Sequence, residues 1–293
     1  MRTLLRSSSI FLGLALLIGA LHAPTATAQQ RGDALPRVSP NAVVQQTIGI
    51  TDVRIAYGRP SVRGRTIFGG LVSYDEVWRT GANEATTITF SDDVMIEGEP
   101  IDAGRYGLFT IPGEESWTII INDVGEQWGA FNYDQSRDVV RVEVTPESTA
   151  RPWEMMTFTF ESVTDSSAHA VLSWAETRVP FRIDVNTTEV IRQRANEAAA
   201  NASDWQTPFQ YAAYALQNDA MMDDALRWVN RSIELQENFN NLAVKAQLLA
   251  TMGDYGEAVS VGERAVDVGQ SMDEAPRGLD QLQQSVESWR SQM

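Results

Sequence analysis

The spacing of apolar residues changes once along the chain, close to Val185. Between residues 41 and 185, short runs rich in Val, Ile, Thr, Phe and Trp are broken by Gly, Pro, Asn and Asp, a pattern typical of strands joined by turns. After Val185 the apolar residues recur at helical spacing. Strands followed by helices, without alternation of the two, predict an α+β protein with segregated domains.

The strand-like half predicts an antiparallel β-sandwich domain over residues 41–185, because about ten short strands follow one another with no helix between them. Turn residues at 101–104 and 112–115 mark two of the reversals. The expected strands are 43–48, 53–57, 86–90, 94–97, 106–111, 117–122, 139–145, 155–163, 168–174 and 181–185.

The helical half, residues 186–293, begins with two capping signals. Asn186 precedes a first turn that carries Glu189. Thr207 precedes Pro208, which predicts Thr207 as an N-cap with proline at the first helical position. A final helix is expected where Leu279 starts an apolar stripe.

An internal repeat lies within the helical half. Asp224-Ala225-Leu226 and Glu257-Ala258-Val259 stand 33 residues apart, with small residues at equivalent places. The segment 253–258 resembles the inter-helix turn of a tetratricopeptide repeat, and the resemblance covers 207 to about 268. It implies an α-helical, tetratricopeptide-like hairpin domain whose surface docks a protein or peptide partner. An ordinary helical bundle is the alternative, since two copies are fewer than a solenoid normally needs.

The first 28 residues predict a signal peptide. Arg2 and Arg6 precede an apolar run over 10–21, and Ala26-Thr27-Ala28 fits a cleavage site. We therefore expect a periplasmic or secreted protein that begins at Gln29, with a disordered linker over 29–40. An uncleaved anchor is the alternative, although the run is shorter than the roughly 20 residues that a membrane span needs.

Charge and residue scarcity exclude several classes of function. The net charge is -16, and the mature chain would carry -18, which argues against nucleic-acid binding. The chain has no cysteine, and a triad or a Schiff base would have to use His169 in a predicted strand or Lys245 in a predicted helix. We expect no catalytic residue, no metal site and no cofactor.

One segment, residues 58–83, fits no strand and carries a family resemblance. Its glycines indicate a loop, whereas its aromatic and aliphatic residues indicate an ordered one. Together with two later motifs it resembles the domain-of-unknown-function 2911 family over about 39–181. The family is found mainly in exported bacterial proteins, often with helical repeats following, and has no assigned activity, so the resemblance implies location and fold but no catalytic residue. The motifs are Arg59-Pro60-Ser61, Gly64-Arg65, Ile67-Phe68-Gly69-Gly70-Leu71-Val72, the run VWRTGANEAT from Val77 to Thr86, the run AGRYGLFTIP from Ala103 to Pro112, and Gln127-Trp128-Gly129.

The same segment is a basic island in an acidic protein. Four arginines and no acidic residue lie between Asp52 and Asp75. Guanidinium groups match carboxylates and phosphates, and tryptophan faces can stack on a ring. We predict one pocket for a small anionic or hydroxylated ligand, lined by Arg59, Arg65, Trp78, Arg79, Asn83, Glu84 and Trp128. The alternative is that these residues hold the loop onto the sandwich, with Trp78 in the core.

These observations favour an exported, non-catalytic binding or interaction protein. A carbohydrate-active hydrolase is the alternative, because glycoside hydrolysis needs only two carboxylates and an aromatic platform. Glu84 with Asp75, Glu76 or Glu126 would supply that pair. A purely structural envelope protein is a third reading.

Overall fold

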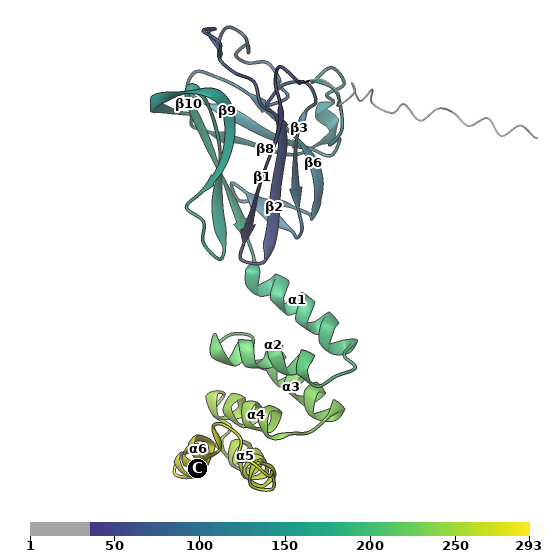
Figure 1. Ribbon diagram of the computed structural model, residues 1–293, viewed down its shortest axis with the longest axis vertical. Coiled ribbons are helices and arrows are strands. Elements are labelled where there is room, and N and C mark those ends of the chain that lie inside the picture. The colour runs from purple at the N-terminus through teal and green to yellow at the C-terminus, as the bar shows by residue number, and fades with distance from the viewer. Residues whose placement is uncertain (1–35) are drawn as a thin grey trace, which may run out of the picture. The chain divides into compact units, whose positions relative to one another are not determined.

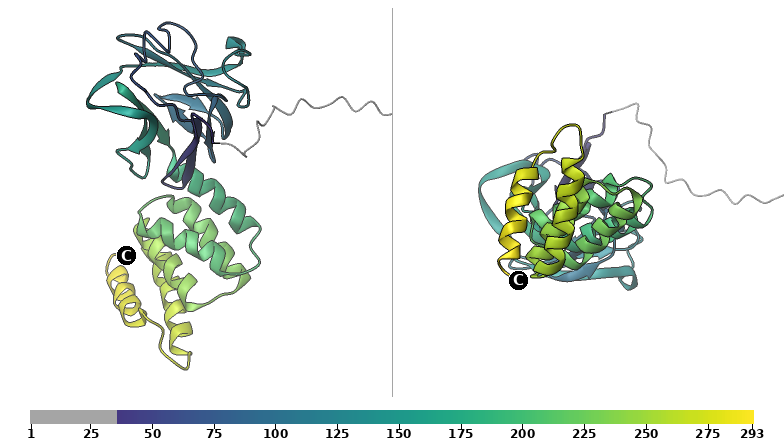
Figure 2. Two further views of the ribbon diagram at one scale, coloured as in Figure 1. Left: turned by 45° about the horizontal axis from the view of Figure 1, so that its top comes forward. Right: turned by 90° about the horizontal axis from the view of Figure 1, so that it is seen from below.

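The computed structural model describes residues 36–293, with strands over 41–185 and helices over 187–290 (Figures 1 and 2). The predicted α+β class with segregated strands and helices is confirmed. The expected signal peptide and residues 29–35 of the expected linker lie outside the described residues. Within the described residues, no helix is long and apolar enough to span a membrane.

Within residues 36–293, ten strands form two antiparallel sheets (Figure 1). The six-stranded sheet has the order β1-β2-β3-β6-β7-β8, and the four-stranded sheet has the order β5-β4-β10-β9. Their bounds are β1 Asn41–Ile48, β2 Thr51–Gly58, β3 Thr86–Phe90, β4 Val94–Ile96, β5 Glu99–Ile101, β6 Gly104–Ile111, β7 Trp117–Asn122, β8 Asp138–Val144, β9 Glu147–Glu161 and β10 Ser167–Val185.

The inward faces of the two sheets share one apolar core, as in a sandwich. Alternate residues of β2, such as Val53 and Ile55, are fully buried in it, together with Phe158 of β9 and Leu172 of β10. The residues between them on each strand face away from the other sheet. The pattern of alternation seen in the sequence therefore reports directly on the inter-sheet core.

Strand β10 is one long strand, where the sequence predicted two at 168–174 and 181–185. The pairing with β9 passes through register shifts on either side of Ala175, whose φ is +52°, and continues to Arg178. Pairing with β4 begins at Ile183. Pro180 falls between the two paired stretches, so its missing N–H breaks no ladder bond.

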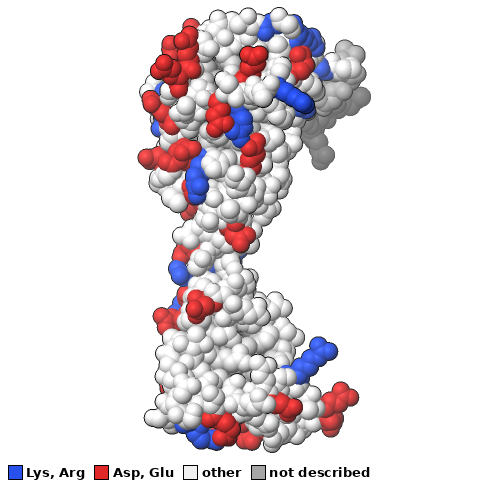
Figure 3. All heavy atoms as spheres, turned by 90° about the vertical axis from the view of Figure 1, so that its left-hand side faces the viewer, with Lys and Arg blue, Asp and Glu red and all other residues white. Residues whose placement is uncertain are grey.

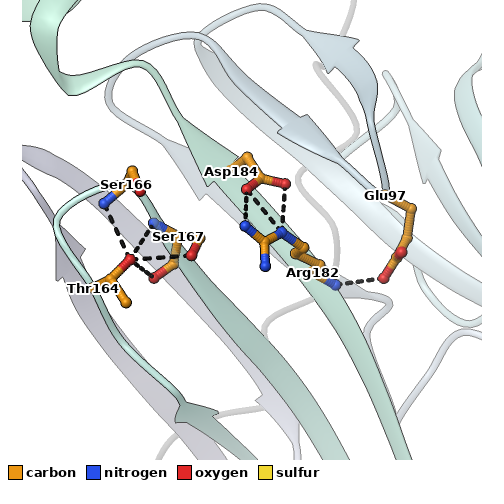
Figure 4. Close-up of polar contacts among 6 residues, drawn as sticks. All are labelled: Glu97, Thr164, Ser166, Ser167, Arg182 and Asp184. Atoms are coloured by element: carbon orange, nitrogen blue, oxygen red, sulfur yellow. Dashed lines mark hydrogen bonds and ion pairs between the residues drawn. The ribbon is translucent and has the colours of Figure 1, made fainter.

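The short strand β5 was not predicted. It consists of three residues with Pro100 at the centre, a pattern that indicates a turn. The backbone pairing with β4 is what makes this segment a strand. Beside this hairpin, the backbone N–H of Arg182 donates to Glu97 Oε1 at 2.6 Å, and the Arg182 guanidinium forms an ion pair with Asp184 (Figure 4). Figure 4 also shows the hydroxyl of Thr164 bonded across the turn that leads into β10.

Six helices follow the strands. The cap of α1 is as predicted, since Asn186 Oδ1 accepts from the N–H of Glu189 at 3.1 Å. The prediction of Thr207 as an N-cap is wrong: α2 begins at Gln206, two residues before the predicted first helical position, and Asp204 accepts from the Thr207 N–H at 2.8 Å. The bounds are α1 Thr187–Ala200, α2 Gln206–Gln217, α3 Met222–Leu235, α4 Phe239–Thr251, α5 Tyr255–Gln270 and α6 Leu279–Arg290.

The repeat positions lie inside the helical packing. Ala225, Ser232, Ala258 and Ala265 are all 0% exposed, so the small residues that recur at the predicted spacing sit where helices meet. In both views of Figure 2, α5 and α6 lie side by side at the yellow end of the chain. Membership of the tetratricopeptide family stays a prediction.

Candidate functional site

The segment between β2 and β3, residues 59–85, first covers the free edge of β9. The N–H of Val62 donates to Glu154 O at 2.7 Å, and the N–H of Met156 donates to Pro60 O at 2.9 Å. An exposed strand edge invites pairing with another chain. The loop therefore acts here as an irregular extra strand that closes the four-stranded sheet.

Two of the predicted ligand arginines are engaged by this closure. Arg59 donates from Nε to Met156 O at 2.9 Å and from Nη2 to Thr157 Oγ1 at 2.7 Å. Arg65 donates from Nε to Val62 O at 3.0 Å and from Nη2 to Ser61 O at 2.6 Å. These bonds agree with the alternative interpretation of the sequence, in which Arg59 and Arg65 hold the loop onto the sandwich.

Trp78 lies between the sheets and faces away from solvent. It is 7% exposed and stacks on Trp174 at 5.9 Å with an interplanar angle of 17°. Phe68 and Trp117 meet it edge-on. A two-way backbone bridge to Thr110, at 2.7 and 3.0 Å, fixes its position.

The other four predicted residues lie where the second part of the loop meets the segment that follows β7. Glu84 forms an antiparallel bridge with Trp128, and the N–H of Gly129 donates to Asn83 O at 3.0 Å. The adjacent amides of Ala85 and Thr86 donate to Gln127 O at 3.0 Å and to Arg79 O at 3.1 Å. We call Arg79, Asn83, Glu84, Gln127 and Trp128 the Arg79–Trp128 site.

The backbone of this site is strained. Four of the nine non-glycine residues with positive φ in the described part of the chain lie in the β2–β3 segment. One of them, Asn83 at +67°, belongs to the site, and another, Thr80 at +55°, directly follows Arg79. A left-handed conformation is unusual for a β-branched residue and costs about 1–3 kcal/mol.

Buried hydrogen bonds offset that strain. Thr80 is 1% exposed, and its hydroxyl lies 3.1 Å from Thr110 Oγ1. Its carbonyl accepts from Thr86 Oγ1 at 2.7 Å. Asn83 tolerates a positive φ better, and its amide donates to Ser39 O at 3.3 Å. Ser39 lies in the stretch that the sequence assigns to a linker.

Alternation along the loop places Arg79 on the outer side of the six-stranded sheet. Trp78 belongs to the inter-sheet core, whereas Val77 belongs to a second small core with Ala85, Phe109 and Ile120. Since neighbouring residues of an extended segment point to opposite faces, Arg79 shares the face of Val77. This second core is covered by the segment that follows β7.

The electrostatics of Arg79 differ from those of its neighbours. Its Nε is buried and has no hydrogen-bond partner, the only such arginine nitrogen in the described part of the chain. Burial lowers the pKa of Arg79. Both amide atoms of Gln127 are also buried without partners. Buried polar groups normally form hydrogen bonds. The lack of partners for three buried atoms of Arg79 and Gln127, close to the start of β3, therefore requires an explanation.

Gln127 was not among the predicted site residues. Its side chain carries no charge, and only its place in the Gln127-Trp128-Gly129 motif could have drawn attention to it.

Five of the ten other arginines in residues 41–185 are paired with carboxylates. Acidic and basic side chains are interspersed on the face shown in Figure 3. The ion pairs are Arg105–Glu126, Arg137–Asp123, Arg141–Asp138, Arg178 with Glu147 and Glu161, and Arg182–Asp184.

A polar network anchors the segment after β7 that carries Trp128. The side chain of Asp138 accepts from Tyr133 Oη at 2.5 Å, from Arg141 Nη1 at 2.7 Å and from Asn122 Nδ2 at 2.8 Å. Burial and the bond to Asp138 raise the pKa of Tyr133 to about 12. The network fixes the base of the segment, while Trp128 remains 45% exposed near its tip.

No group of three or more His, Cys, Asp or Glu side chains within residues 36–293 is placed to hold a metal ion. Searches of curated proteins and of solved structures return no match. Residues 39–183 match the sequence model of the family described as "Protein of unknown function (DUF2911)". This span contains every residue of the Arg79–Trp128 site and both sheets except for the last two residues of β10, so the β-sheet region of the chain matches the DUF2911 family.

Proposed function

We propose that the β domain binds a small anionic ligand at the Arg79–Trp128 site. The observation that carries the proposal is the buried, unpartnered Nε of Arg79, in a loop where Arg59 and Arg65 already donate to backbone carbonyls. A desolvated guanidinium gains more from an incoming carboxylate or phosphate than an exposed one does. The ligand supplies the acceptor that the protein does not.

Two side chains beside Arg79 restrict the chemical class of the ligand. Trp128 is 45% exposed and offers an aromatic face for a ring. The amide of Gln127 offers one donor and one acceptor, which match hydroxyl groups. A hydroxylated ring that carries a carboxylate satisfies all three side chains, so a uronic acid is the first probe to use.

The test is thermal unfolding of the full chain with glucuronate, with glucose as the uncharged comparison. Binding to the folded state alone adds about 2.7 kcal/mol of stability at a ligand concentration one hundred times Kd. We expect glucuronate to raise Tm and glucose to have a much smaller effect. Arg79→Met should abolish the rise, whereas Arg151→Met, at an exposed position on β9, should keep it. An equal rise in Arg79→Met contradicts the proposal.

The proposals on export, catalysis and partner binding rest mainly on the sequence. We infer an exported, non-catalytic protein whose helical region docks a protein or peptide partner, in keeping with the signal-like N-terminus and the buried repeat positions. The proposal does not extend to glycoside hydrolysis, because Glu126 is paired with Arg105 and no observation favours a working carboxylate pair. Turnover of a polysaccharide by the purified protein would overturn the non-catalytic assignment.

A further inference from the structure

A small cavity of about 110 Å³ lies in the β domain among three connections that are distant in sequence. The β2–β3 segment contributes Phe68 and Tyr74, the β6–β7 turn contributes Glu114, and the β8–β9 turn leads into Glu147. None of these residues belongs to the Arg79–Trp128 site. We call this cavity the aromatic–acidic pocket.

Three aromatic residues, Phe68, Tyr74 and Trp117, are among those that line the pocket. Phe68 meets Trp117 edge-on, with ring centroids 4.8 Å apart, and both line the cavity. Tyr74 packs on Gly69, where a Cβ would come within 2.7 Å of the Tyr74 ring. Because Gly69 also has φ +77°, any other residue there would be strained and would displace the tyrosine.

A backbone bond places the aromatic side next to the acidic side. The N–H of Asp75 donates to Pro112 O at 2.8 Å, which ties the residue after Tyr74 to the turn that carries Glu114. Asp75 has φ +59°, another strained conformation in the same segment. The fold therefore holds this tyrosine against the turn at a cost in backbone energy.

The charge around the pocket is negative. Glu147 is paired with Arg178, but Arg178 also pairs with Glu161, so one guanidinium serves two carboxylates. Glu114 is exposed and has no ion-pair partner within the described residues. Glu114 and Glu147 are the charged residues among those that line the pocket, and no arginine or lysine is among them.

We propose that the aromatic–acidic pocket binds a small organic cation of the methylated-ammonium class. Aromatic faces attract such cations, and carboxylates supply the opposite charge. The volume is well below the roughly 300 Å³ at which pockets for drug-sized ligands begin, so a single ammonium head group fits the site better than a sugar does. The negative charge of the whole chain raises the local concentration of cations.

Calorimetric titration of the full chain with choline tests the proposal. Neohexyl alcohol, the uncharged carbon isostere of choline, is the ligand control. We expect saturable binding of choline, binding of the alcohol that is about tenfold weaker or more, and a Kd about threefold higher in Glu114→Gln. Tyr74→Leu should raise Kd by about fivefold. Glu115→Gln, at the next residue of the same turn, should bind like the unmodified protein.

Three results would overturn the proposal. They are an absence of saturable binding at about 10 mM choline, equal affinity for the uncharged isostere, and equal effects of Glu114→Gln and Glu115→Gln. The pocket shares no residue with the Arg79–Trp128 site, so failure here leaves the anion proposal untouched.

Discussion

Arg59 and Arg79 lie in one loop and have opposite predicted effects on stability. In Arg59→Met the carbonyl of Met156 loses a charged donor, whereas the Thr157 hydroxyl keeps its bond to Met155 O at 2.9 Å. A hydrogen bond to a charged group contributes about 1.5–3 kcal/mol, and a buried acceptor left without a donor costs about 1–3 kcal/mol. Because methionine keeps the apolar stem, we expect Arg59→Met to lower the free energy of unfolding by about 2–3 kcal/mol.

Arg79→Met removes a desolvated charge and breaks no side-chain bond. Its unfolding free energy should therefore change by less than about 0.5 kcal/mol, or increase slightly. Urea denaturation of both variants measures the difference, and Tm should fall by about 5–10 °C in Arg59→Met alone. A comparable loss in Arg79→Met would show that Arg79 holds the loop, and the reasoning about the site would be refuted. An unchanged Arg59→Met would refute the edge-closure argument.

Two further predictions concern packing and pH. In α5, Gly262→Ala should destabilise the helical region by about 1–3 kcal/mol, because the new methyl would lie 2.5 Å from Val286. Gly256→Ala should stabilise it by about 0.5–1 kcal/mol in the same denaturation assay, because the nearest atom to its new methyl would be Asp254 Oδ1 at an ordinary contact distance of 3.9 Å. Tyr133 has a folded-state pKa of about 12, above its ordinary value of 10, so the bond to Asp138 stabilises fully below about pH 10 and is lost as pH rises through 12. The stability gap between the unmodified protein and Tyr133→Phe should be constant from about pH 7 to 9 and close above pH 10; a gap that widens there would contradict the assignment.

The strands were predictable wherever alternation carried through to both ends. β3 and β7 have the bounds that the sequence predicts. β10 was divided in the prediction because Pro180 reads as a breaker, although it lies where no ladder bond is required. β5 consists of three residues and exists only by its pairing with β4, which local sequence does not encode.

The sequence predicted most residues of the candidate site, but it did not predict which of them bond within the protein and which have no partner. The sequence identifies a cluster of arginines, yet Arg59 and Arg65 bind mainly backbone carbonyls, which leave no trace in residue identity. Trp78 could be assigned to either side of the sheet until the period of the loop was known. The buried, unpartnered state of Arg79 is a property of packing, and only the structure reveals it.

Anion binding by the β domain requires that the Arg79 guanidinium meet a ligand from outside the protein. The direct measurement follows the Nε–H resonance of Arg79 by NMR during a titration with glucuronate and, separately, with glucose. We expect a saturable shift of this resonance with glucuronate, in step with the Trp128 indole resonance, and a much smaller shift with glucose. An Arg79 resonance that stays in place while glucuronate binds elsewhere, or while nothing binds, would contradict the proposal.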